Sequence, residues 1–123
     1  MYRFEKLRVF HNAMGLVEEI YKTTRSLPKD ERFALIDQLK RSSTSVVLNI
    51  AEGSGALGDT EFKSFLRNSL KSLDETVAGL KIAEKLFATN IIAGLEKCDI
   101  VGKELNALIK SLKTESQRLK TKS

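Results

Sequence analysis

Residues 45–62 read SVVLNIAEGSGALGDTEF, a stretch that two different folds could explain. A phosphate-binding loop needs glycines between a strand and a helix, and in P-loops a Lys-Ser/Thr pair follows them. Here Val46, Val47 and Ile50 keep helical spacing up to the glycines, and no Gly-Lys-Ser/Thr sequence follows. The stretch therefore predicts a helix end, a loop and a new helix, with Gly53 or Gly55 in the left-handed conformation that ends many helices.

Apolar residues recur every three or four positions along most of the chain, which is the period of an α-helix. The pattern predicts no strand and helices at about residues 5–27, 30–53, 60–87 and 91–113. Pro28 separates the first two helices, and Asp30 is placed to cap the second. We expect an all-α fold, an antiparallel up-down-up-down four-helix bundle over residues 1–113, with a frayed helical end and basic tail at 114–123.

The apolar faces of the first two predicted helices indicate which residues face the core and which are left for an interface. On the second, the inward positions are Phe33, Ile36, Leu39, Ser43, Val46 and Ile50. On the first, a core stripe containing Val9 and Leu16 is accompanied by a second apolar stripe that includes Phe10, Met14 and Tyr21. Because a monomeric bundle needs only one stripe per helix, we predict that Phe10, Met14 and Tyr21 form an oligomer interface.

The composition limits the class of protein. The chain has 123 residues, which is one domain's worth, and its single cysteine, Cys98, cannot form an intramolecular disulfide or a cysteine metal cluster. The N-terminal segment is charged and lacks a signal peptide's apolar region, and no window is apolar enough to span a bilayer. We expect a soluble cytoplasmic protein with no membrane partner.

Catalytic and metal-binding patterns are missing from the sequence. A di-metal carboxylate bundle needs Glu-x-x-His motifs, but His11 is the one histidine and the residue three before it is Arg8. Nucleophilic catalysis needs a base beside Ser, Cys or Thr, and His11 would have to serve alone. We therefore expect no catalytic residue, no metal, no cofactor and no enzyme activity.

Asn49 and Glu52 are polar residues three apart on one helix face. One interpretation makes Glu52 an acid/base or metal ligand. The interpretation we favour is structural: Glu52 pairs with Arg41 or Lys40, and Asn49 bonds backbone across a helix or subunit boundary. Arg41, Asn49 and Glu52 are thus predicted as a structural polar group.

The arrangement of positive charge is the main functional clue. The chain has 21 Lys+Arg and 16 Asp+Glu, a formal net charge of +5. On the third predicted helix, basic residues fall within a sector of roughly 80°, interrupted mainly by Asp74. They are Lys63, Arg67, Lys71, Lys81 and Lys85. Such a stripe can neutralise backbone phosphates with little sequence preference, although a solvated helix face explains it as well.

Several motifs resemble one protein family in order and spacing. They are FEKLRVF at 4–10 followed by Ala13, Leu27-Pro28 with Glu31 and Phe33, Gln38 with Arg41, NIAEG at 49–53, and Phe62 with Phe65-Leu66. Over almost the whole chain they look like the four-helix bundle proteins encoded by intervening sequences of 23S ribosomal RNA genes. The resemblance implies a homopentameric, barrel-like assembly. A related branch, the accessory variability proteins of diversity-generating retroelements, implies binding to RNA and to a reverse transcriptase.

These observations together give two functional hypotheses. The first is a non-enzymatic, homo-oligomeric basic scaffold that binds nucleic acid, structured RNA above all and DNA as a possible substitute, through phosphate contacts. The alternative is a protein-binding assembly module that docks an acidic partner such as a reverse transcriptase. Salt-dependent binding to generic RNA separates the two.

Overall fold

The structure, a computed structural model, describes residues 1–112 as four α-helices and three short helical segments, with no β-strand in that range. The α-helices are α1 (Arg8–Thr24), α2 (Asp37–Ser54), α3 (Asp59–Phe87) and α4 (Ile92–Ser111). A 3₁₀ turn, η1 (Arg3–Lys6), precedes α1; a 3₁₀ turn, η2 (Lys29–Glu31), and a π-helical turn, η3 (Arg32–Ile36), precede α2. The predicted tail at 114–123 lies outside the described residues.

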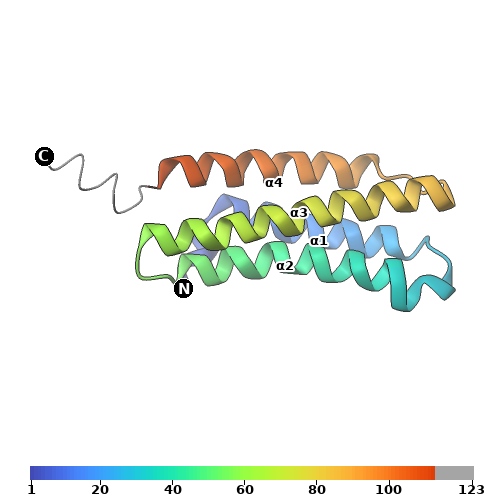
Figure 1. The fold of residues 1–123 in the computed structure, drawn as a ribbon, viewed down its shortest axis with the longest axis horizontal. Helices are drawn as coiled ribbons and strands as arrows, with labels where there is room; N and C mark the ends of the chain where they lie inside the picture. Colours follow the sequence, from blue (N-terminus) through green and yellow to red (C-terminus); the bar gives the residue numbers. More distant parts are fainter. Residues whose placement is uncertain (113–123) are drawn as a thin grey trace, which may run out of the picture.

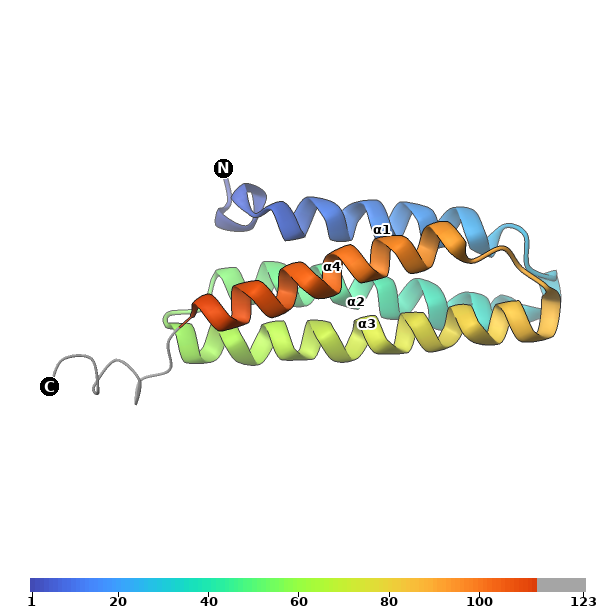
Figure 2. The ribbon, with the colours of Figure 1, turned by 90° about the horizontal axis from the view of Figure 1, so that it is seen from above.

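The four helices lie side by side as an elongated bundle (Figures 1 and 2). The α1–α2 and α3–α4 connections are at one end, and the α2–α3 connection is at the other (Figure 1). Each helix contacts its neighbour along the chain, and α1 also contacts α4. No helix within residues 1–112 is both long and apolar enough to cross a bilayer.

The core lies between all four helices and follows the predicted helical period. Its largest fully buried side chains include Leu16, Ile20, Ile50, Leu66 and Leu80. Burying a side chain of this size contributes about 1.5–3 kcal/mol to the free energy of unfolding. The apolar faces predicted for the first and second helices are therefore confirmed at Leu16 and Ile50.

Small and hydroxyl-bearing residues join α2 to α3. The Ser69 hydroxyl donates to the Val46 carbonyl oxygen at 2.8 Å, and the Ser42 and Thr76 hydroxyl oxygens lie 2.8 Å apart. The Ser72 hydroxyl lies 2.9 Å from that of Ser45. No buried side-chain nitrogen or oxygen in the described range lacks a hydrogen-bond partner, so this polar seam does not cost the fold an unsatisfied group.

The start of the second helix differs from the prediction. The Glu31 carboxylate, and not that of Asp30, accepts a hydrogen bond from the Leu35 backbone N–H at 3.3 Å. The π-helical turn that follows has more residues per turn than an α-helix, which changes the direction of the side chains. As a result Phe33, predicted to face inward, is 86% exposed, and Leu35 is buried in its place.

Gly53 is needed for close packing and not for a left-handed helix end. It lies inside α2, and no described glycine has a positive φ. A Cβ added at Gly53 would lie 2.7 Å from the Phe65 Cβ and 2.9 Å from the Phe62 ring. The expectation of a left-handed glycine here is therefore wrong, because Gly53 lets α3 approach α2. Among the described residues the left-handed position is Ala88, after α3.

Candidate nucleic-acid interface

The outer side of α3 carries most of the predicted basic stripe. Burial of Leu66, Leu73 and Leu80 fixes which side of the helix faces the core. Positions on the opposite side therefore face solvent. The exposed cations of this side, here named the α3 stripe, are Arg67, Lys71, Lys81 and Lys85.

Lys63 does not belong to this surface. Its side chain is buried, with 7% of the residue exposed, so its prediction as a phosphate contact is wrong. The helical angle places it at the edge of the basic sector. A lysine there can lay its aliphatic stem along apolar surface, which an angle calculation does not reveal.

The cations of the α3 stripe have no carboxylate partner among residues 1–112. Within that range the ion pairs join Arg41 to Asp37 and Lys103 to Asp99. Asp74 is exposed on α3 and lies between the two halves of the stripe. At 1.5 Å per residue the stripe extends for about 27 Å along α3, enough to follow several successive phosphates.

The predicted structural group of Arg41, Asn49 and Glu52 is not assembled within one chain. The Arg41 guanidinium pairs with the Asp37 carboxylate one turn earlier on α2. Asn49 donates from Nδ2 to the Ser45 carbonyl oxygen at 2.9 Å, which is a contact inside its own helix. Glu52 is exposed. The predicted pairing of Arg41 with Glu52, and of Asn49 across a helix boundary, is therefore wrong for the single chain.

The predicted oligomer interface is partly accessible. Met14 and Tyr21 are exposed, at 43% and 40%, and the Lys40 ammonium lies 4.7 Å from the centre of the Tyr21 ring. Phe10 is half-buried, and its ring centre lies 4.7 Å from that of Phe4. Leu48 of α2 lines the same groove as Tyr21 and is exposed. The sequence interpretation missed Leu48, although it lies in the apolar run that precedes NIAEG. The role of these residues stays a prediction.

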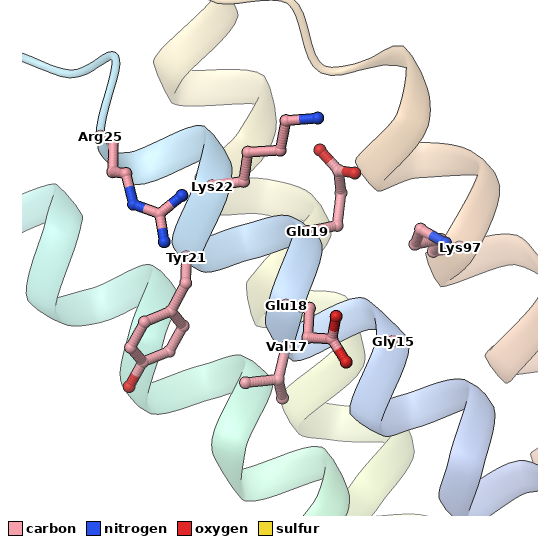
Figure 3. A pocket seen from close by; sticks show the side chains of 8 residues that line it. All are labelled: Gly15, Val17, Glu18, Glu19, Tyr21, Lys22, Arg25 and Lys97. Atoms are coloured by element: carbon pink, nitrogen blue, oxygen red, sulfur yellow. The ribbon is translucent and has the colours of Figure 1, made fainter.

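A wide hollow of about 640 Å³ lies over the outer surface of α1, with Lys97 of α4 at its border (Figure 3). Its charged side chains are of both signs: Glu18 and Glu19 lie beside Lys22, Arg25 and Lys97. Among residues 1–112 no group of three or more His, Cys, Asp and Glu side chains could hold a metal ion. The mixed charge gives this hollow no preference for an anion or a cation.

Cys98 lies in α4 and faces the core. Burial raises the pKa of its thiol to about 12, because a thiolate is poorly solvated there. At neutral pH the group is therefore a thiol, whereas a nucleophile or metal ligand would have to be a thiolate. Its burial in the core is that of a packing residue.

Comparisons with known proteins place this geometry in a family. Residues 5–114 match the family described as 23S rRNA-intervening sequence protein. A crystal structure of a Bacteroides thetaiotaomicron protein, described as of unknown function and from the S23 ribosomal protein family, is 21% identical with a TM-score of 0.60. The alignment covers 83% of this chain and 92% of that one, and at this identity it shows the fold alone. No curated protein matches the sequence. The chain belongs to the 23S rRNA-intervening sequence protein family.

Proposed function

We propose that the protein is a non-enzymatic, homo-oligomeric basic scaffold of the cytoplasm that binds nucleic acid, with structured RNA as its ligand. The α3 stripe makes the contacts, through phosphate groups and not through bases. No aromatic residue interleaves with its four cations, so the surface offers charge without stacking. Affinity then depends strongly on salt and weakly on sequence.

The observation that carries this proposal is a row of four exposed cations without carboxylate partners in the described part of the chain. Surface lysines in folded proteins commonly pair with carboxylates one turn away, which lowers the local positive potential. Here the positive charge is left available to a polyanion. The family's name refers to a ribosomal RNA gene insert, which agrees with an RNA ligand.

The assembly completes the proposed surface. We propose an antiparallel up-down-up-down bundle that forms a homopentameric ring through Phe10, Met14 and Tyr21, with Leu48 beside them. Met14, Tyr21 and Leu48 are exposed apolar side chains on neighbouring helices, a composition typical of interfaces. A ring multiplies the α3 stripe and raises the positive potential that each RNA molecule meets.

A second candidate function is a protein-binding module that docks an acidic partner such as a reverse transcriptase. Ile82 and Leu86 favour it, because both are exposed on the same helix as the α3 stripe. Apolar side chains next to cations are more typical of a protein interface than of a phosphate-binding surface. This candidate predicts negligible RNA affinity at physiological salt.

RNA binding tests the first candidate directly. A labelled RNA hairpin and an unrelated single strand are titrated with the wild type and with Arg67→Glu/Lys71→Glu. We expect both RNAs to bind the wild type at low salt and to lose affinity together in the variant. A folded wild type that binds neither RNA at low salt contradicts the nucleic-acid proposal and favours the protein-docking candidate.

Light scattering tests the assembly separately. We expect a mass several times the 13.8 kDa of one chain at micromolar concentration, and a smaller mass for Met14→Glu/Leu48→Glu. Leu57→Glu is a matched control, because Leu57 is fully exposed in the α2–α3 connection and outside the proposed interface. A wild type that is monomeric under these conditions contradicts the proposed ring.

A further inference from the structure

A second concentration of positive charge lies where α1 connects to α2. A hollow of about 260 Å³ is lined there by cations from three parts of the chain. Arg25 directly follows α1, Lys29 and Arg32 lie in the turns η2 and η3, and Lys40 is on α2. Leu27, which is buried, and Ile36 supply apolar lining, and the hollow also borders Tyr21 of the proposed oligomer interface. We name this hollow, with the residues that line it, the connection hollow.

Among residues 1–112, the side chains that line the connection hollow include no carboxylate. The carboxylates nearby in sequence are engaged elsewhere or lie outside it: Asp37 pairs with Arg41, and Glu31 accepts from the Leu35 N–H. Asp30 is exposed and does not line the hollow. Within residues 1–112 none of the four cations has a carboxylate within 4 Å. Among the described residues, the side chains that line the hollow therefore carry a net positive charge.

Two of these cations lie at the N-terminal end of a helix, where acidic side chains are the favourable ones. Lys29 and Arg32 precede α2, near the positive end of its dipole. Positive charge there is unfavourable for the helix, whereas negative charge is favourable. Lys29 and Arg32 are thus placed unfavourably for α2, and Asp30 and Glu31 between them offset part of this positive charge.

We propose that the connection hollow binds an oligophosphate, meaning two or three phosphates in series. Four cations around one small hollow exceed the single charge of a backbone phosphate, whereas a triphosphate carries several charges on a compact group. Lysine and arginine both donate charge-assisted hydrogen bonds to phosphate oxygens. The ligand can be the 5′-triphosphate end of an RNA chain or a free oligophosphate such as a nucleoside triphosphate. The site shares no residue with the α3 stripe and does not depend on its function.

Calorimetric titration with inorganic tripolyphosphate tests the site itself. We expect binding to the wild type and at least about tenfold weaker binding to Lys29→Glu/Arg32→Glu, since two charge-assisted contacts are lost. Sulfate at equal ionic strength should not compete. Thermal unfolding controls for misfolding, and the reversed charges should leave the melting temperature unchanged or higher.

The matched control is Lys6→Glu/Lys110→Glu, which changes the net charge by the same amount. Both lysines are exposed, and η1 and the end of α4 lie at the opposite end of the bundle (Figures 1 and 2). We expect this variant to bind tripolyphosphate within about twofold of the wild type, because Coulomb attraction across the bundle is screened. Arg67→Glu/Lys71→Glu should also keep this binding, which separates the site from the α3 stripe.

Two RNAs of one sequence, with a 5′-triphosphate or a 5′-hydroxyl end, distinguish the sources of the ligand. A preference for the triphosphate end that disappears in Lys29→Glu/Arg32→Glu supports the site and assigns it to RNA ends. Equal binding of both RNAs, with tripolyphosphate binding retained, supports the site and assigns it to a free oligophosphate. The proposal is overturned if the wild type does not bind tripolyphosphate at low salt, or if the matched control loses binding to the same extent.

Discussion

The inner and outer sides of α3 are made from different kinds of residue. Toward α2, Ser69 and Thr76 are buried, and each of their hydroxyls has a hydrogen-bond partner. Toward solvent, Arg67 and Lys71 are exposed and have no carboxylate partner among residues 1–112. On the inner side the hydroxyls are hydrogen-bonded within the fold, while on the outer side the cations make no ion pair within residues 1–112.

This difference separates stability from function along a single helix. A group that is already satisfied inside the fold contributes to the free energy of unfolding and has nothing left for a partner. An exposed cation contributes little to stability and retains its charge for a ligand. Substitutions on the inner side should therefore change the free energy of unfolding, and those on the outer side should change binding.

The largest effect on stability is expected at Gly53, where α2 packs tightly against α3. Gly53→Ala places a Cβ 2.7 Å from the Phe65 Cβ, an atom that cannot move without its backbone. We expect a loss of about 1–3 kcal/mol in the free energy of unfolding, measured by urea denaturation, because overpacking forces the helices apart.

Gly15→Ala is the matched control for this variant. Apart from its chain neighbours and the backbone of its own helix, no described atom lies within 4 Å of a Cβ built at Gly15, which is inside α1. Alanine there should stabilise the protein by about 0.5–1 kcal/mol through helix propensity alone. Equal behaviour of the two variants would mean that α2 and α3 are not held together by this contact.

A somewhat smaller effect is expected from the buried hydroxyls. Thr76→Val keeps the shape of the side chain but removes its bonds to Ser42 and to the Ser72 carbonyl oxygen. We expect a loss of about 1–2 kcal/mol, since two buried hydrogen bonds are lost and each contributes about 0.5–1.5 kcal/mol. Thr44→Val removes a part-buried bond to the Lys40 carbonyl within α2 and should cost less than about 0.5 kcal/mol.

The smallest effect on stability is expected on the outer side. Arg67→Glu/Lys71→Glu changes two exposed residues that make no ion pair within the described range. The free energy of unfolding should change by no more than about 0.5 kcal/mol. A loss comparable to that of Gly53→Ala would show that these cations stabilise the fold, and the contrast between the two sides of α3 would fail.

Local spacing predicted most of the fold because the apolar period is strong in every helix. The buried positions of Leu16, Ile50, Leu66 and Leu80 follow from that period, and Pro28 falls between the first two helices. The resemblance to the family also came from motifs with fixed spacing, and the match over residues 5–114 confirms it.

Features that depend on contacts between distant residues were not predictable in this way. The need for glycine at position 53 comes from its close packing against Phe62 and Phe65 of the next helix. The hydrogen bond between Ser42 and Thr76 joins residues 34 apart in the sequence. Phe33 was misplaced because a π-helical turn interrupts the regular period before α2. Lys63 was misplaced because a helical angle gives direction but not what packs against an edge position.

The candidate site was partly predictable for the same reason. Exposure of Arg67, Lys71, Lys81 and Lys85 follows from the core period of one helix. The connection hollow was not found, since its cations come from separate elements that only the fold brings together. A dense run of charge from Lys29 to Arg32 was the signal available in the sequence.

The salt dependence of RNA binding by the α3 stripe tests the central claim most directly. Fluorescence anisotropy with a labelled RNA hairpin, between about 50 and 200 mM salt, gives the slope of log affinity against log salt. For the wild type we predict a steep negative slope, and for Arg67→Glu/Lys71→Glu much weaker binding with a slope smaller by about two, one for each phosphate contact removed. A wild type that does not bind at the lowest salt, or a variant with the affinity and slope of the wild type, would contradict the account.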